Sequence, residues 1–108
     1  MEPVEINAGA WYLRALRADE LIDDRHALAE LGETDPHYVA RRSAQWASDT
    51  GLSWAVCEPT SGEMLAEVTL DPAAATLNSR ARDGHADAAK AGVQSVRRFA
   101  EAVLGLTM

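Results

Sequence analysis

The segment from Leu52 to Leu70, LSWAVCEPTSGEMLAEVTL, constrains the fold more strongly than any other part of the chain. Apolar residues recur at every second position in both of its halves, as at Trp54 and Val68, which is the pattern of a strand with one buried face. Between the halves, Pro59 and Gly62 favour a turn, because proline presets φ and glycine adopts positive φ easily. The segment therefore predicts a half-buried β-hairpin whose apolar face is covered by helices from elsewhere in the chain.

The composition is typical of one folded domain. The chain has 108 residues, of which 47% are hydrophobic. No stretch approaches the roughly 20 apolar residues of a membrane span, and the acidic N-terminus does not resemble a signal peptide. The single cysteine, Cys57, permits no internal disulfide, which agrees with a reducing compartment. We therefore expect residues 1–108 to form a single soluble, cytoplasmic domain without a membrane partner.

The charge is acidic overall and unevenly distributed. The net charge is −7, which argues against a nucleic-acid partner, since such proteins need a basic surface. Residues 1–79 carry 14 acidic and 5 basic side chains, whereas residues 80–108 carry 3 acidic and 5 basic ones. The C-terminal part is therefore better suited to an anionic ligand, although an acidic surface also serves solubility alone.

A strand and a helix are expected before the hairpin. Apolar and polar residues alternate over residues 11–17, which predicts a first strand. Asp19 is a suitable cap for a helix that runs to about Leu31, with Leu21 and Leu28 on its apolar face and Gly32 after its end. The first strand and this helix would together supply part of the cover for the hairpin.

A second helix and a loop flank the hairpin in the sequence. The pair Asp35-Pro36 is typical of a helix start and Gly51 of its end, with Val39 and Trp46 on one buried face. After the hairpin, the stretch Asp71–Ser79 contains an early proline and several small residues, and it predicts a loop.

The last helix is expected from about Gly84 to Leu104, where Gly105 would end it. Its N-terminal end offers unpaired N–H groups and a partial positive charge, and a glycine there lets phosphate oxygens approach the backbone. Arg80 and Arg82 would add contacts to a phosphate. The simpler alternative is an ordinary helix start with its arginines in water.

Several stretches resemble one family. Residues 13–19, LRALRAD, resemble the opening strand and helix start of GNAT N-acetyltransferases, especially the branch related to ribosomal-protein N-terminal acetyltransferases. In that family a strand and two helices precede a hairpin, and a splayed strand that admits the pantetheine arm leads into a pyrophosphate-binding loop and its helix. The run Arg82-Asp83-Gly84-His85-Ala86 is similar to that loop, and residues 96–106 are similar to that helix. The resemblance implies that Arg82, Asp83, Gly84, His85 and Ala86 bind acetyl-CoA.

The sequence departs from the family pattern in two respects. The family loop reads Q/R-x-x-G-x-G/A, and Ala81 stands where glutamine or arginine belongs. The family continues beyond this helix with further strands and often a tyrosine that acts as general acid, so the chain resembles the N-terminal part of such a domain. We therefore expect an open sheet edge that favours self-association and little turnover by an isolated monomer, unless Tyr38 or Glu67 replaces the acid.

Other candidate residues have simpler explanations. The histidines, His26, His37 and His85, fall on separate elements and lack the spacing of a helical metal site, so we expect no metal. Cys57 lacks a nearby basic residue and is expected in the core. Glu67 is expected to face solvent, but it becomes a candidate general base if it lines a cleft, where burial raises a carboxyl pKa.

These observations predict an α+β domain in which an antiparallel sheet is packed by three helices, as in a truncated GNAT acyl-CoA N-acyltransferase fold. The resemblance implies transfer of an acetyl group from acetyl-CoA to a primary amine by direct attack of the amine on the thioester. The acidic N-terminal part would suit a cationic acceptor. The alternative is a non-catalytic, acetyltransferase-like protein that binds CoA or a protein partner.

Overall fold

Five strands and three helices make up the computed structural model, which describes residues 1–108. In chain order the elements are β1 (Ile6–Ala8), β2 (Trp11–Arg14), α1 (Arg25–Glu30), α2 (Tyr38–Ser48), β3 (Leu52–Cys57), β4 (Met64–Asp71), β5 (Thr76–Ala81) and α3 (Ala86–Val103). The strands form one antiparallel sheet in the order β1-β2-β3-β4-β5. The predicted α+β fold with an antiparallel sheet and three helices is confirmed.

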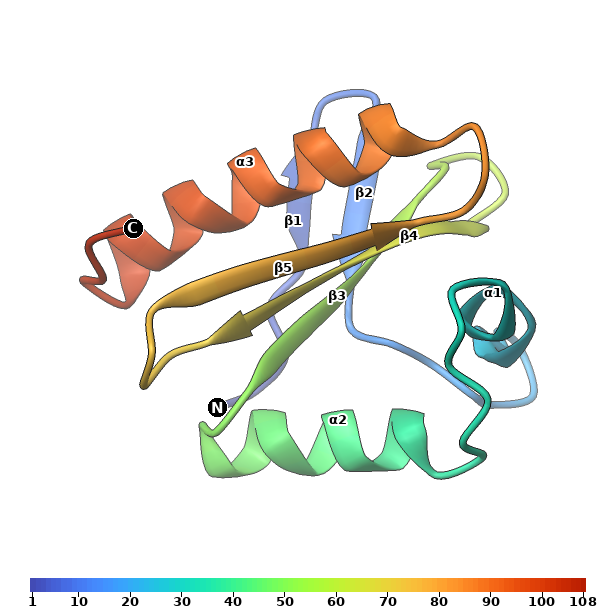
Figure 1. Cartoon of the computed structure of the whole chain (residues 1–108), viewed down its shortest axis with the longest axis horizontal. Coiled ribbons are helices and arrows are strands. Elements are labelled where there is room, and N and C mark those ends of the chain that lie inside the picture. The colour runs from blue at the N-terminus through green and yellow to red at the C-terminus, as the bar shows by residue number, and fades with distance from the viewer.

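The helices lie on opposite sides of the sheet (Figure 1). α3 covers one face, where Val96 belongs to the same hydrophobic cluster as Val56 and Val68 of the central strands. α1 and α2 lie on the other side, where Leu28 of α1 packs in a second cluster with Cys57. We call this second side of the sheet the α2 face.

The predicted hairpin is present as β3 and β4. Trp54 lies opposite Val68 in the register, and Gly62 has a φ of +72° in the connecting turn. The prediction of one exposed face is wrong, because every residue of β3 is buried. Since helices cover both faces, Ser53 and Ala55 are as inaccessible as the alternating apolar residues.

The N-terminal strand differs from its prediction. The strand expected over residues 11–17 ends at Arg14, and it pairs with the three-residue strand β1, which the sequence pattern did not indicate. Beyond Arg14 the chain leaves the sheet, and a bridge between Ala18 and Asp23 closes a short turn there. Hydrogen bonds to aspartate side chains hold the loop together with this bridge and with the backbone bond from the Asp24 N–H to the Arg17 carbonyl at 2.8 Å.

The first helix is also shorter than predicted, since α1 covers only Arg25–Glu30. Asp19 caps a turn instead of a helix, because its Oδ1 accepts the N–H groups of Leu21 and Ile22 at 2.9 Å each. Leu21 is 86% exposed and not on a buried face. Gly32 follows the end of α1 with a φ of +91°, as expected.

The second helix is confirmed in the middle and differs at its ends. It begins at Tyr38, after a turn in which Asp35 Oδ1 accepts the N–H of His37 at 2.8 Å. It ends where Asp49 takes a left-handed conformation, two residues before Gly51. Trp46 is 1% exposed, and its ring centroid lies 5.1 Å from that of Trp54.

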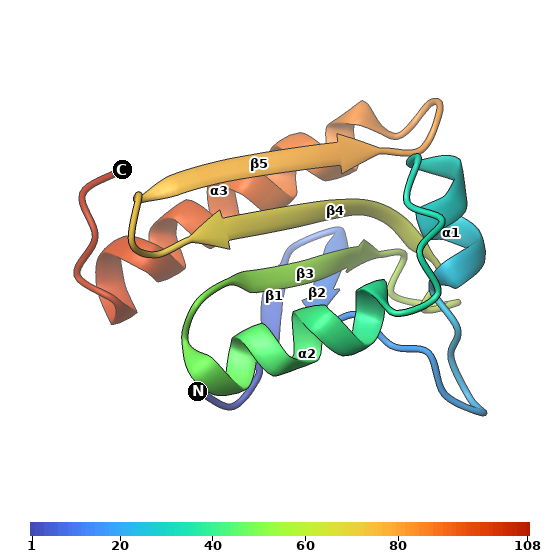
Figure 2. The same cartoon turned by 60° about the horizontal axis from the view of Figure 1, so that its bottom comes forward.

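The stretch Asp71–Ser79, predicted as a loop, is mostly strand. β4 extends to Asp71, and β5 begins at Thr76 after a turn in which Ala75 has a φ of +54°. The proline and small residues thus mark a tight turn and not a long loop. β5 pairs with β4 over six residue pairs, while its other edge pairs with no strand (Figure 2).

The C-terminal helix is confirmed as α3. Gly92 lies so close to the sheet that a Cβ at this position would be 2.7 Å from Val56 Cγ2. Gly105 has a φ of +66°, and the N–H of Leu106 donates to the Ala100 carbonyl at 3.1 Å, as expected for a helix that ends at glycine. None of the three helices has both the length and the apolar character that a membrane crossing requires.

Candidate functional site

The loop between β5 and α3 contains the residues predicted to bind a pyrophosphate. Gly84 has a φ of +82°, and a Cβ there would meet no atom within 4 Å, so the chain is open to solvent at this point. The backbone N–H groups of Asp83, Gly84, Ala86 and Asp87 make no hydrogen bond within the protein. N–H groups at a helix start can donate to an anion, so the backbone of this loop fits a phosphate.

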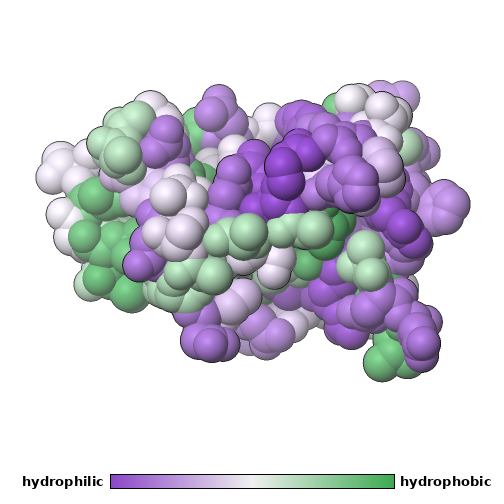
Figure 3. All heavy atoms as spheres, turned by 90° about the horizontal axis from the view of Figure 1, so that it is seen from below, coloured by the Kyte–Doolittle hydropathy of each residue, from purple (hydrophilic) through white to green (hydrophobic).

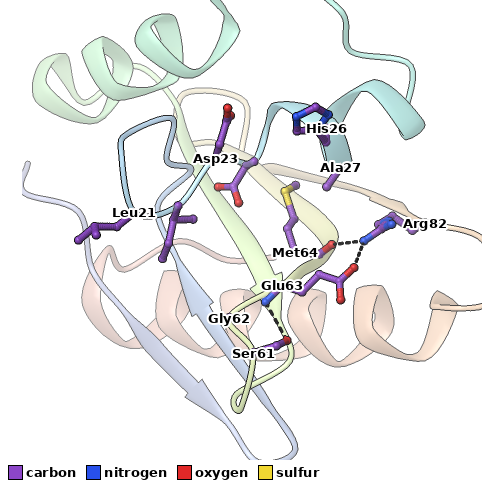
Figure 4. A pocket seen from close by; sticks show the side chains of 11 residues that line it. Leu21, Asp23, His26, Ala27, Ser61, Gly62, Glu63, Met64 and Arg82 are labelled. Atoms are coloured by element: carbon purple, nitrogen blue, oxygen red, sulfur yellow. Dashed lines mark hydrogen bonds and ion pairs between the residues drawn. The ribbon is translucent and has the colours of Figure 1, made fainter.

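The side chains around the loop favour an anion less. Arg82 pairs with Glu63 at 2.6 Å (Figure 4). It also pairs with Glu30, and both interactions use donors that a phosphate would need. Asp83 and Asp87 add two carboxylates in the loop and in the first turn of α3. An anion held by the backbone would therefore lie among acidic side chains.

A cavity of about 290 Å³ lies between residues 21–27 and the hairpin turn (Figure 4). Its charged residues are Asp23, Asp24, Glu63 and Arg82, and His26 also lines it. Each of its carboxylates already pairs with an arginine of the protein. This cavity therefore offers little to a charged ligand.

A second cavity, of about 250 Å³, lies on the α2 face of β4 and β5. Its functional groups come from Glu33, Tyr38 and Arg42 on the helical side and from Glu67, Thr69, Asn78 and Arg80 on the sheet. We call it the Glu67 cavity. Figure 3 views the molecule from this side, where hydrophilic side chains predominate.

Glu67 lines this cavity and is only 2% exposed, so the expectation that it faces solvent is wrong. Its Oε1 accepts hydrogen bonds from Arg80 Nε at 3.0 Å and Nη2 at 2.6 Å. The sheet register causes this contact, because Arg80 lies directly opposite Glu67. Arg80 therefore belongs to the Glu67 cavity, and the phosphate contact predicted for it would require it to leave Glu67.

Tyr38 connects α2 to this ion pair. Its hydroxyl donates to Glu67 Oε2 at 2.7 Å and accepts from Arg42 Nε at 3.0 Å and Arg80 Nη2 at 3.2 Å. Burial raises the pKa of Tyr38, and the hydrogen bond to Glu67 raises it further. The phenol therefore stays protonated at neutral pH and donates to the carboxylate.

The sequence did not predict that Arg42 or Glu33 belongs to this site. The one signal for Arg42 was its i, i+4 spacing from Tyr38, which places both side chains on the same face of a helix. No sequence signal marked Glu33, because it reaches Arg80 only through the packing of the α1–α2 connection against β5. Asn78 was also missed, because it falls in the stretch predicted as a loop, and Thr69 was missed because it reaches the cavity through its pairing with Asn78.

The remaining candidate residues lie apart from the Glu67 cavity. The histidines, His26, His37 and His85, are on separate segments, and no group of three or more His, Cys, Asp or Glu side chains is arranged to hold a metal ion. Cys57 is fully buried, as expected of a core residue, and burial raises the pKa of its thiol to about 11.

No family model and no curated protein matches the sequence. Among solved structures, the chain is similar to a presumed ribosomal-protein-serine acetyltransferase from Vibrio cholerae, with a TM-score of 0.76 and 15% sequence identity. The match covers 96% of this chain and 70% of that one. At this identity the likeness shows the fold alone, and the chain has a GNAT-like, acetyltransferase-like fold.

Proposed function

We propose that this protein binds acetyl-CoA and transfers its acetyl group to a primary amine. The observation that carries the proposal is the position of β5. One face of β5 lines the Glu67 cavity, and its end leads directly into residues 82–86, where backbone N–H donors are free. In the family that the sequence resembles, the strand before the pyrophosphate loop borders the pantetheine arm, so the position of β5 supports the proposal that both reactants bind beside it.

Residues 82–86 would hold the pyrophosphate of acetyl-CoA, with the N–H groups of Asp83, Gly84 and Ala86 as donors. The unpaired edge of β5 would lie along the pantetheine arm. When bound, acetyl-CoA supplies a thioester carbonyl for attack by a neutral amine, so that a C–N bond forms, the C–S bond breaks and CoA leaves as a thiolate, which takes up a proton from water.

The amine would lie in the Glu67 cavity. The Glu33 side chain is 24% exposed and approaches Arg80 only to 3.4 Å, so its carboxylate retains acceptor capacity for an ammonium group. Glu67 Oε2 accepts one hydrogen bond, from Tyr38, and has room for another. These two carboxylates would orient the amine, and Glu67 is our candidate for the base that takes its proton.

The side chains of the loop favour a second function. The ion pairs of Arg82 with Glu30 and Glu63, together with Asp83 and Asp87, oppose strong phosphate binding. They support a non-catalytic protein that binds CoA weakly or binds a protein partner. The unpaired edge of β5 would then recruit a strand, including one from a second copy of this chain, because free N–H and C=O groups at an edge pair readily.

Calorimetric titration with acetyl-CoA at low salt, followed by an assay of CoA release over a panel of primary amines, tests both functions. We expect binding in the micromolar to millimolar range and amine-dependent release of CoA. Replacing Glu67 with Gln should leave acetyl-CoA binding unchanged and slow release by about 10²- to 10⁴-fold, the usual cost of losing a general base. Binding without release would support the non-catalytic function, and no binding in the millimolar range would reject both roles for CoA.

A further inference from the structure

We propose that the Glu67 cavity selects acceptors that carry a carboxylate close to their primary amine, that is, small zwitterionic amines such as amino acids. This inference rests on the proposed function and names its substrate class. It depends on one arginine that has no charged partner, on two polar side chains that have no hydrogen bond, and on the acidic groups opposite them.

Arg42 is the arginine of the cavity without a carboxylate partner. Its Nε donates to the Tyr38 hydroxyl at 3.0 Å and its Nη1 to Gln45 Oε1 at 2.9 Å, whereas Nη2 makes no hydrogen bond. No carboxylate oxygen lies within 4.0 Å of its guanidinium. Arg97 and Arg98 also lack such a partner, but they are exposed on α3, so Arg42 is the half-buried cation left unpaired.

The guanidinium of Arg42 is already held in place. It lies over the Tyr38 ring, 5.2 Å from the centroid, and its two hydrogen bonds fix its orientation. A carboxylate that binds Nη2 therefore forms a charge-assisted hydrogen bond without first having to order a flexible side chain.

Thr69 and Asn78 supply further groups for a ligand. They lie opposite each other in the β4–β5 register, on the same face as Glu67 and Arg80, and both line the cavity. Neither side chain takes part in a hydrogen bond within the protein. The hydroxyl and the amide are thus available to the oxygens of a carboxylate.

The acidic side of the cavity is close to Arg42. The Tyr38 hydroxyl contacts both Glu67 Oε2, at 2.7 Å, and Arg42 Nε, at 3.0 Å, so both charges lie within the span of one small molecule. A bare amine would leave Arg42 unpaired, and a bare carboxylate would leave the acceptor sites of Glu33 unused. At about 250 Å³ the cavity is smaller than the clefts of about 300–1,000 Å³ that hold drug-sized ligands.

The test uses matched pairs of amines and the whole, isotope-labelled chain without acetyl-CoA. β-Alanine is compared with ethylamine, and γ-aminobutyrate with propylamine, because each pair differs only by a carboxylate. NMR follows the side-chain amide of Asn78 and the Nε–H of Arg42. We expect each carboxylated amine to bind at least about tenfold more tightly than its partner, since a charge-assisted bond is gained.

Arg42→Gln should abolish the preference for the carboxylated amines. Arg41→Gln is the matched control, because it removes the same charge from an exposed neighbour that pairs with Asp35. The comparison of matched amines on the unchanged protein decides the question even if Arg42→Gln does not fold.

Equal affinity within each pair, or no shift at Asn78 and Arg42 in the millimolar range, would overturn the inference. Acetyl transfer to bare amines as fast as to carboxylated ones would also overturn it, while leaving the proposed function standing. Selective binding of carboxylated amines without any acetyl transfer would support the inference and reject the catalytic function.

Discussion

Arg14 and Asp24 form a bidentate ion pair, in which Nη1 and Nη2 each donate to a carboxylate oxygen at 2.8 Å, and neither residue is more than 4% exposed. Asp24 Oδ2 also accepts the N–H of Arg17 at 2.7 Å. The pair attaches the connection before α1 to β2. Because the Asp24 carboxylate is used in this way, it does not cap α1, although it occupies the N-cap position.

Replacing Asp24 with Asn should lower the free energy of unfolding by about 3–5 kcal/mol, because it leaves the Arg14 guanidinium buried without a counter-charge. Asp23→Asn is the control, since Asp23 pairs with Arg25 at the surface, and we expect a much smaller loss because water screens an exposed pair. Urea unfolding of the two variants measures the difference. Equal losses would show that the buried pair contributes no more than a surface pair.

The helix α3 approaches the sheet most closely at Gly92. A Cβ there would lie 2.7 Å from Val56 Cγ2 and 2.9 Å from Val68 Cγ2. Gly92→Ala should therefore destabilise the protein by about 1–3 kcal/mol, even though alanine favours helix by about 1 kcal/mol. If the clash is the cause, Val56→Ala should cost less in the Gly92→Ala protein than in the unchanged one, as a double-mutant cycle of unfolding free energies would show.

The elements predicted well from the sequence are those whose residues alone determine their structure. The hairpin and α3 have long apolar patterns, and Gly62 and Gly105 sit where positive φ is required. The failures have two causes. β5 carries polar residues because its α2 face is part of a cavity and its edge is free, so it lacks a strand pattern. Asp19, which is predicted to cap a helix, caps a turn instead, and Asp24, at the N-cap position of α1, bonds to Arg14.

The Glu67 cavity could not be predicted from the sequence for a related reason. Glu67 was recognised as an unusual carboxylate within an apolar strand. Its partner Arg80 follows only from the β4–β5 register, and the sequence pattern predicts a loop up to Ser79, where β5 lies. Tyr38 and Arg42 join the cluster through the packing of α2 on the sheet, which no local pattern specifies.

The thiol of Cys57 should be unreactive in the folded protein. Cys57 has no exposed surface, and burial raises its pKa to about 11, so almost no thiolate exists at pH 8. We expect no reaction with a disulfide reagent over minutes in buffer and complete reaction in denaturing urea. Since Cys57 is the single cysteine, stoichiometric labelling before unfolding would contradict its core position.

The two tyrosines, Tyr12 and Tyr38, should lose their protons at a higher pH than a free tyrosine does. Burial and the neighbouring Glu5 carboxylate raise the pKa of Tyr12 to about 12, and burial also raises that of Tyr38. Because the folded state favours the protonated phenol, each tyrosine contributes to stability. This contribution is complete below the unfolded pKa of about 10 and is lost as the pH rises toward 12. Absorbance of tyrosinate should therefore rise near pH 10 in urea but not in the folded protein. Tyr12→Phe isolates the signal of Tyr38, and a step at pH 10 in either folded protein would contradict the burial.

The acidic side chains of the loop lead to the last prediction, which rests on acetyl-CoA binding at residues 82–86. Asp83 and Asp87 flank the free N–H groups, so their carboxylates repel a bound phosphate. Asp83→Asn and Asp87→Asn should each tighten binding of acetyl-CoA by about two- to fivefold at low salt, the size of an interaction between exposed charges. The gain should shrink at high salt, because screening weakens the repulsion.

Gly84→Val should act in the opposite direction and weaken binding. The protein has space for the added side chain, but the branched group blocks approach to the backbone and is strained at a φ of +82°. Glu101→Gln is the control, since it removes one exposed charge near the far end of α3 and should leave affinity unchanged. Calorimetry at two salt concentrations measures all four variants. If Asp83→Asn, Asp87→Asn and Glu101→Gln change the affinity equally, the phosphate does not bind at this loop and only the net charge of the protein matters.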